Sequence, residues 1–270
     1  MLGKMMKHEW NAVMKVMLPA NAVLVIITLL GRIMVSAKVF DMDNEIASLI
    51  SGLSITLYIL CLLAVSLCCT IFIGYRFYKT VYTDEGYLLH TLPVTTHEII
   101  LSKTLTGVAW TLITSIFLFA SVIILVLGFI PPNEYASAMR DISYGIETYI
   151  GPKFTAWVIF FIFIMIAGAF YSVLWLFAGI AFGQLLPKHK VLGAFIGFGV
   201  IYVLTQIISV VAMLCTGIIS RASDMAAGSV DTFISYMEYV YITSFSVSVL
   251  LAVGFYFFTH FMMNRKLNLD

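Results

Sequence analysis

The chain has 270 residues, of which 61% are hydrophobic and only 11% are charged. Soluble domains carry roughly 25% charged residues, so this composition excludes an ordinary water-soluble fold. The formal net charge is +1, which leaves no basic excess for binding nucleic acid. The length suits about six membrane-spanning helices of ~20 residues with short connections. We therefore expect a single transmembrane domain over residues 1–270 and no soluble catalytic domain.

Six long apolar segments predict the membrane-spanning helices. They cover about residues 17–36, 49–74, 104–130, 154–184, 191–220 and 239–262. These segments lack the alternation that is typical of membrane β-strands. The expected fold class is therefore all-α, a bundle of six transmembrane helices.

The distribution of basic residues predicts the orientation of the spans, because Lys and Arg near span ends stay on the cytoplasmic side. With the N-terminus inside, the inner segments hold Lys4, Lys7, Lys15, Arg76, Lys79, Lys103, Lys188, Lys190, Arg265 and Lys266. The outer segments hold fewer, namely Arg32, Lys38, Arg140, Lys153 and Arg221. Both termini are therefore predicted to be cytoplasmic.

Residues 2–17 show the spacing of an amphipathic helix. One face carries Leu2, Met6, Trp10, Val13 and Met17, and the other carries Lys4, Lys7, Asn11 and Lys15. This pattern is typical of an interfacial helix that contacts lipid at the inner leaflet. The alternative is a polar extension of the first span. Pro19 predicts a break between this helix and the span.

The inner segment 75–103 is the longest expected cytoplasmic connection. It predicts a short apolar helix that ends at Pro93, followed by an N-cap at Thr95 and Thr96, with His97 and Glu98 after it, opening the third span. The apolar residues Tyr87, Leu88, Leu89 and Leu92 follow Asp84 and Glu85. An apolar cluster on the cytoplasmic side indicates a docking surface for a partner. The alternative is a hairpin that packs against its own spans.

Three further patterns concern the outer side and the packing of the spans. Residues 131–152 predict an amphipathic helix lying on the outer surface, and residues 221–238 predict a small external cap. Gly179 and Gly183 in the fourth span, with Gly193 and Gly197 in the fifth, predict a close approach of these two helices.

The sequence also lacks the residues and motifs of several functional classes. The central parts of the six predicted spans contain no Asp, Glu, Lys, Arg or His, which disfavours an ion-coupled carrier. No phosphate-binding loop, zinc-like spacing or membrane-protease motif is present. We therefore expect no catalytic residue, no metal site and no cofactor on this chain.

One stretch of the inner segment resembles a known family. Tyr82-Thr83-Asp84-Glu85-Gly86, then Leu88-Leu89, Leu92-Pro93-Val94-Thr95 and Ser102-Lys103, is similar to the coupling-helix region of ABC-2-type exporter permeases. The resemblance implies a half-transporter that dimerises with an identical or related chain and binds separate ATPase subunits, which would hold ATP and Mg²⁺. It implies that ATPase coupling involves Asp84, Glu85, Gly86, Tyr87, Leu88, Leu89, Leu92 and Pro93. The interfacial helix would add a second contact through Met6, Trp10 and Met14.

The expected cargo also follows from this resemblance. Small permeases with this segment resemble bacterial exporters of antimicrobial or amphipathic toxin peptides, including the phenol-soluble-modulin type, and they lie in the bacterial cytoplasmic membrane. Uncharged spans suit such peptides, and they suit drugs or lipids equally. From the residues alone, two alternatives stay open: an ATP-independent carrier or channel, and a sensory or structural membrane subunit.

Overall fold

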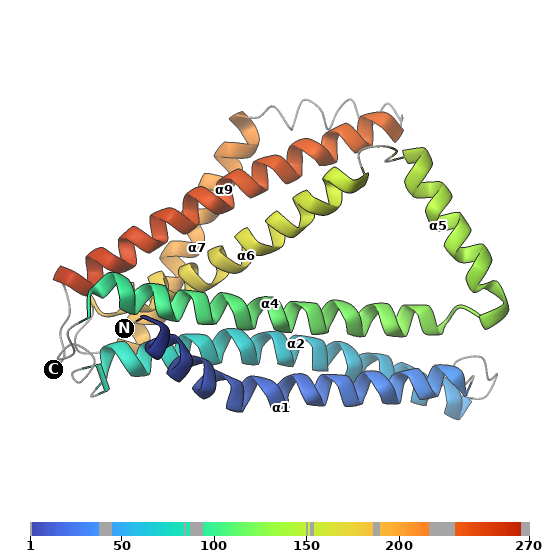
Figure 1. Ribbon diagram of the computed structural model, residues 1–270, viewed down its shortest axis with the longest axis horizontal. Helices are drawn as coiled ribbons and strands as arrows, with labels where there is room; N and C mark the ends of the chain where they lie inside the picture. Colours follow the sequence, from blue (N-terminus) through green and yellow to red (C-terminus); the bar gives the residue numbers. More distant parts are fainter. Residues whose placement is uncertain are drawn as a thin grey trace.

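The computed structural model describes residues 2–37, 45–83, 85–86, 94–149, 151, 154–185, 190–215 and 230–265. This part of the chain contains α-helices, one 3₁₀ helix and no strand (Figure 1). The α-helices are α1 (Leu2–Ser36), α2 (Glu45–Tyr82), α4 (Thr96–Gly128), α5 (Tyr135–Tyr149), α6 (Phe154–Gly183), α7 (Lys190–Cys215) and α9 (Val230–Arg265). The 3₁₀ helix η2 (Pro132–Glu134) precedes α5. The all-α prediction is confirmed.

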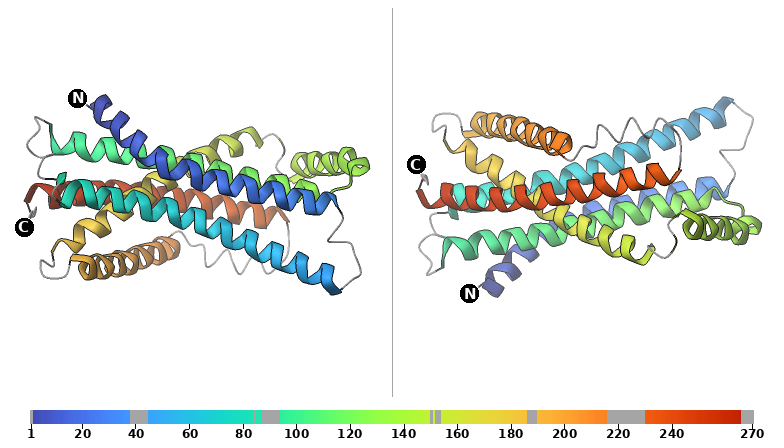
Figure 2. Two further views of the ribbon diagram at one scale, coloured as in Figure 1. Left: turned by 90° about the horizontal axis from the view of Figure 1, so that it is seen from below. Right: turned by 90° about the horizontal axis from the view of Figure 1, so that it is seen from above.

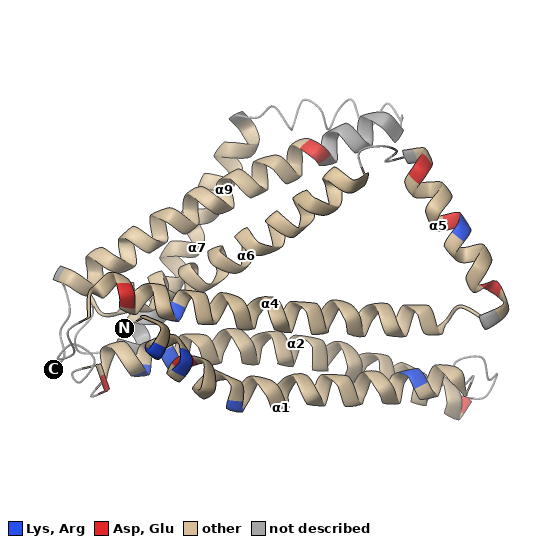
Figure 3. Cartoon of the chain, in the orientation of Figure 1, with Lys and Arg blue, Asp and Glu red and all other residues tan. Residues whose placement is uncertain are grey.

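Six of the described α-helices, namely α1, α2, α4, α6, α7 and α9, are long and apolar enough to cross a membrane. They expose large apolar side chains along their lengths, for example Leu30 at 56%, Leu57 at 62% and Leu250 at 72%. Exposure of so much apolar surface to water is unfavourable, whereas its contact with lipid chains costs little because these chains are as apolar as leucine. Figure 3 shows that the charged residues gather toward the two ends of the bundle. The protein is a multi-pass membrane protein.

The helices form two groups. α1, α2 and α4 pack on one another, and α6, α7 and α9 form the second group (Figures 1 and 2). The groups meet at the end of the bundle that holds Leu2 and Arg265, which we call the proximal end. They diverge toward the other end, which we call the distal end, where α5 connects α4 to α6.

The largest buried cluster joins the two groups near the proximal end. Phe77 of α2 stacks on Phe177 of α6, with ring centroids 3.8 Å apart. Buried around them are Val13, Met17, Ile73, Val81, Ile99, Ile100, Val173, Ile180, Met262 and Met263. Because these residues come from α1, α2, α4, α6 and α9, burial of apolar area fixes both groups to each other at this end.

Polar contacts align α1 with α4 along the bundle. Asn21 Nδ2 donates a hydrogen bond to Thr114 Oγ1 at 3.3 Å. The hydroxyls of Thr28 and Ser121 lie 2.7 Å apart, and Tyr58 of α2 reaches the same Ser121 hydroxyl at 2.7 Å. Both α1–α4 pairs are 93 residues apart in the chain, so the two helices run parallel.

The predicted break at Pro19 is wrong, because α1 is one helix with Pro19 inside it. A proline removes one helical hydrogen bond and bends a helix, but it does not end a helix whose flanks are held. Met17 and Asn21, on either side of Pro19, are both buried. Figure 1 shows the resulting bend in the first half of α1.

The predicted amphipathic pattern of residues 2–17 is confirmed. Val13 and Met17 are buried. The opposite face, with Lys4, Lys7, Asn11 and Lys15, is exposed.

Other boundaries differ from the prediction. α2 continues to Tyr82, past the expected end at residue 74. α7 ends at Cys215, and residues 216–229 lie outside the described part of the chain. The first half of the predicted cap at 221–238 therefore stays untested, while its second half belongs to α9. The helix predicted within 131–152 is present as α5.

The close approach of α6 and α7 is confirmed at two glycines. A Cβ added to Gly197 would lie 2.8 Å from the carbonyl oxygen of Gly179. A Cβ added to Gly179 would overlap the ring of Phe198. Glycine at these positions lets the two backbones pack directly.

Candidate functional site

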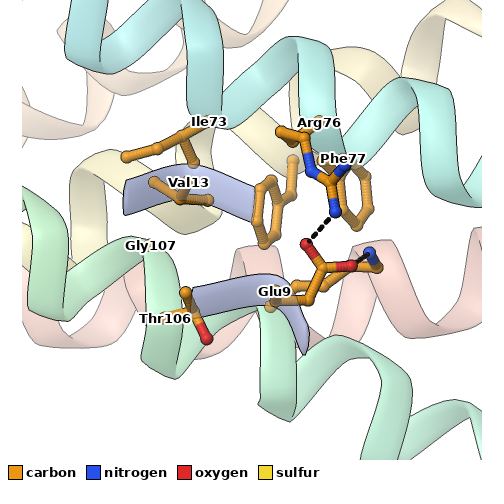
Figure 4. A pocket seen from close by; sticks show the side chains of 9 residues that line it. Glu9, Val13, Ile73, Arg76, Phe77, Thr106 and Gly107 are labelled. Carbon is orange, nitrogen blue, oxygen red and sulfur yellow. Dashed lines mark hydrogen bonds and ion pairs between the residues drawn. The ribbon is translucent and has the colours of Figure 1, made fainter. Parts of the chain in front are cut away.

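Three charged side chains from three helices meet near the proximal end (Figure 4). Glu9 of α1 accepts a hydrogen bond from Arg76 of α2, with Nη2 and Oε2 2.9 Å apart. Its other oxygen, Oε1, lies 2.7 Å from Nζ of Lys103 on α4. The side chains are exposed by only 13% for Glu9, 17% for Arg76 and 5% for Lys103. One carboxylate thus ties the start of α1 to both α2 and α4.

Thr80 completes this arrangement. Its hydroxyl oxygen accepts a hydrogen bond from Lys103 Nζ. The same hydroxyl donates to the carbonyl oxygen of Arg76 at 2.6 Å. We call Glu9, Arg76, Thr80 and Lys103 the Glu9 cluster.

A small cavity of about 20 Å³ lies against the Glu9 cluster. Its apolar lining comes from Val13, Ile73, Phe77 and Phe177. This volume is close to that of a single water molecule. Apolar walls lower the local dielectric, which strengthens the charge-assisted hydrogen bonds within the cluster.

The cluster has an excess of positive charge, because one carboxylate faces two cations. Buried charges are tolerated only when they are paired and hydrogen-bonded. Glu9 is therefore the residue on which the burial of Arg76 and Lys103 depends. A separate ion pair at the end of α2, between Lys79 and Glu85 at 3.0 Å, is far more exposed, at 43% and 47%.

The start of α4, which carries Lys103, is fixed by local contacts. Thr95 and Glu98 form a capping box: Glu98 N donates to Thr95 Oγ1, and Thr95 N donates to Glu98 Oε2. This confirms the N-cap predicted at this position. Thr96 Oγ1 donates to Asn264 Oδ1 of α9 at 2.7 Å, so the start of α4 is also tied to the end of α9.

The predicted coupling residues fall into two sets. Asp84, Tyr87, Leu88, Leu89, Leu92 and Pro93 lie outside the described residues. Glu85 and Gly86 are described, three and four residues after the end of α2 at Tyr82. Gly86 N donates to the carbonyl oxygen of Thr83 at 2.7 Å, and a Cβ on Gly86 would overlap the carbonyl of Val81. The chain therefore turns tightly at a position that requires glycine.

The residues predicted to add a second contact, Met6, Trp10 and Met14, differ in their surroundings. Trp10 packs on Trp110 of α4, with ring centroids 5.0 Å apart. Met6 is half-buried and Met14 is 36% exposed. Trp10 thus contacts the bundle itself, next to Glu9.

Sequence reasoning missed the Glu9 cluster as a site. The sequence analysis uses Arg76 and Lys103 only to predict the orientation of the spans, and Lys103 also belongs to the pattern that resembles a known family. One signal was present: Glu9 lies three residues after Met6 and four before Val13, on the apolar face. A carboxylate on an apolar helix face is a sign of a buried cationic partner.

Comparisons with family models, curated proteins and solved structures find no match to this chain.

Proposed function

We propose that this chain is the membrane permease subunit of an ATP-driven exporter of the ABC type. Two such chains, identical or related, would pair in the bacterial cytoplasmic membrane with both termini inside. Separate ATPase subunits would bind ATP and Mg²⁺. The cargo would be amphipathic or hydrophobic, with antimicrobial or toxin peptides as the first candidates.

The observation that carries this proposal is the position of the Glu9 cluster. α2 ends at Tyr82 and α4 begins at Thr96, so the segment that resembles a coupling helix connects these two helices. Arg76 and Thr80 lie within the last two turns of α2, and Lys103 lies about two turns into α4. A partner that pushes on this segment would move both helix ends. Through Glu9, the same displacement would reach α1.

The need for a separate energy source also supports the proposal. The chain has no phosphate-binding loop, and the centres of its apolar segments contain no Asp, Glu, Lys, Arg or His. A carrier driven by ions or protons normally keeps such a residue within the membrane. The competing functions, an ATP-independent carrier or channel and a membrane sensor or structural subunit, predict no obligatory ATPase partner.

The test is purification of the chain from its native membranes in a mild detergent. We expect a P-loop ATPase to co-purify at one copy per permease, with hydrolysis that responds to cargo peptides. Replacement of both Leu88 and Leu89 by Asp should release the ATPase, whereas replacement of both by Met should retain it. An intact, monodisperse chain without an ATPase would contradict the proposal and favour a carrier or a sensor.

A further inference from the structure

The start of α1 carries a basic face that takes no part in the Glu9 cluster. Lys4, Lys7 and Lys15 are exposed, and so is Asn11, which lies among them. We call these four residues the lysine face. Figure 3 shows basic residues along the first part of α1, at the proximal end. None of the ion pairs formed by the described residues involves these three lysines.

Glu9 lies on the opposite side of the same helical turns. With the rotation of an α-helix at about 100° per residue, the lysine face spans about 80°, and Glu9 points about 160° away from its centre. The Glu9 side chain contacts Arg76 of α2 and Lys103 of α4. The lysine face therefore points away from both of these helices. Figure 2 shows that the first part of α1 projects from the side of the bundle.

The exposed side of α1 changes from basic to apolar after Lys15. By helical spacing, Leu18, Val25 and Leu29 continue the lysine face, and all three are exposed. In a chain that crosses a membrane, exposed apolar side chains contact lipid chains, whereas the amines of lysines near a span end reach the headgroups. The change after Lys15 therefore marks the border between lipid headgroups and hydrocarbon.

The charge of this face selects one class of lipid. A lysine amine donates charge-assisted hydrogen bonds to phosphate oxygens. Residues 2–18 contain one acid, Glu9, and its carboxylate is engaged by Arg76 and Lys103 on the other side of the helix. The lysine face is therefore attracted to a surface with net negative charge, and more weakly to phosphatidylcholine, whose phosphate is balanced by choline.

We propose that the lysine face binds anionic phospholipids of the leaflet at the proximal end, and that this contact holds Glu9 in its cluster. Residues 2–18 would then be held from two sides, by Arg76 and Lys103 on one and by lipid phosphates on the other. Without anionic lipid, the start of α1 would separate from α2 and α4 more often. The binding needs no ATPase, so it does not rest on the proposed function.

The experiment uses the full chain in nanodiscs, without ATPase or ATP. One kind of disc contains phosphatidylcholine alone, and the other contains phosphatidylcholine mixed with phosphatidylglycerol of the same acyl chains. Hydrogen–deuterium exchange at residues 6–12 measures how often the start of α1 opens. We expect phosphatidylglycerol to slow this exchange about fivefold or more, because each lysine near an anionic surface contributes about a factor of five. Inorganic phosphate added to discs of phosphatidylcholine alone should not slow it.

Variants locate the contact. A chain that combines Lys4→Gln, Lys7→Gln and Lys15→Gln should lose the slowing by phosphatidylglycerol. The matched control replaces the same three lysines by Arg, which keeps the charge and should keep the slowing. Equal exchange in the two kinds of disc, equal slowing by inorganic phosphate, or full slowing in the Gln variant would overturn the proposal. Absence of an ATPase partner would leave this result intact, so the two proposals fail separately.

Discussion

Nζ of Lys103 lies 2.7 Å from Oε1 of Glu9, although 94 residues separate them in the chain. This contact fixes the start of α1 against α4, and the side chain of Lys103 is only 5% exposed there. Because Arg76 reaches the other oxygen of the same carboxylate, removal of Glu9 leaves two cations facing each other.

The Glu9→Gln variant should therefore be markedly less stable. Removing one partner of a buried ion pair lowers the free energy of unfolding by about 3 kcal/mol. Thermal unfolding in detergent, followed by size-exclusion chromatography, measures the loss. Addition of Lys103→Met should restore part of the stability, because it removes one of the uncompensated charges. The control is Glu85→Gln, which alters the exposed pair with Lys79. Equal melting temperatures for Glu9→Gln and Glu85→Gln would contradict the role given to Glu9.

The capping box predicts a local effect at the start of α4. Thr95→Ala removes the hydroxyl that accepts from Glu98 N, and loss of such a cap costs about 1 kcal/mol. Hydrogen–deuterium exchange should become faster at residues 96–99 and stay unchanged in the middle of α4. Thr95→Ser keeps the hydroxyl and should exchange like the unmodified chain. Equal exchange rates at residues 96–99 in the unmodified chain and in both variants would show that the cap does not stabilise the start of α4.

The contact of α6 with α7 predicts a difference between two glycines of one helix. Gly197→Ala places a methyl group 2.8 Å from the carbonyl oxygen of Gly179, so the helices must separate. Overpacking of this kind costs about 1–3 kcal/mol. Gly199→Ala is the matched control, since a Cβ there meets nothing within 4 Å. We expect a lower melting temperature for Gly197→Ala alone, and the reverse order would refute the close packing.

The hydrogen bonds of the Tyr135 hydroxyl attach the start of α5 to the rest of the bundle. Its hydroxyl donates to the carbonyl oxygen of Leu127 at 2.9 Å and accepts from Arg32 Nη2 at 3.2 Å. Tyr135→Phe removes both hydrogen bonds, at about 1 kcal/mol each. Amide exchange at the start of α5 should accelerate. Tyr144→Phe, on a side chain that is 71% exposed, should leave this exchange unchanged. Similar exchange in both variants would mean that the hydroxyl of Tyr135 does not anchor α5.

The features that sequence alone predicted depend on local rules. The face on which Val13 lies follows from helical spacing. The cap at Thr95 follows from a side chain three residues before Glu98, and the contact at Gly197 follows from the absence of a side chain. Each of these rules depends either on residues that lie within a few positions of one another or on the size of a single side chain.

The features that sequence missed depend on tertiary packing. Pro19 carries the same signal whether it ends a helix or bends one, and only the burial of Met17 and Asn21 decides between the two outcomes. The partners of Glu9 lie 67 and 94 residues away, beyond the reach of any local rule. The sequence predicts the end of α2 too early, because hydropathy indicates where the lipid ends and not where the helix ends.

The paired polar contacts between α1 and α4 have a mechanical consequence. Asn21 and Thr28 are seven residues apart, as are Thr114 and Ser121, so axial sliding of either helix would break both contacts at once. The part of α1 after Pro19 therefore moves together with α4. From Lys103 to its end at Gly128, α4 is about 40 Å long, given the rise per residue of a helix. A tilt of about 5° imposed at Lys103 would displace the far end of α4 by roughly 3 Å. Arg32 and Tyr135, which attach α5 there, would follow that displacement.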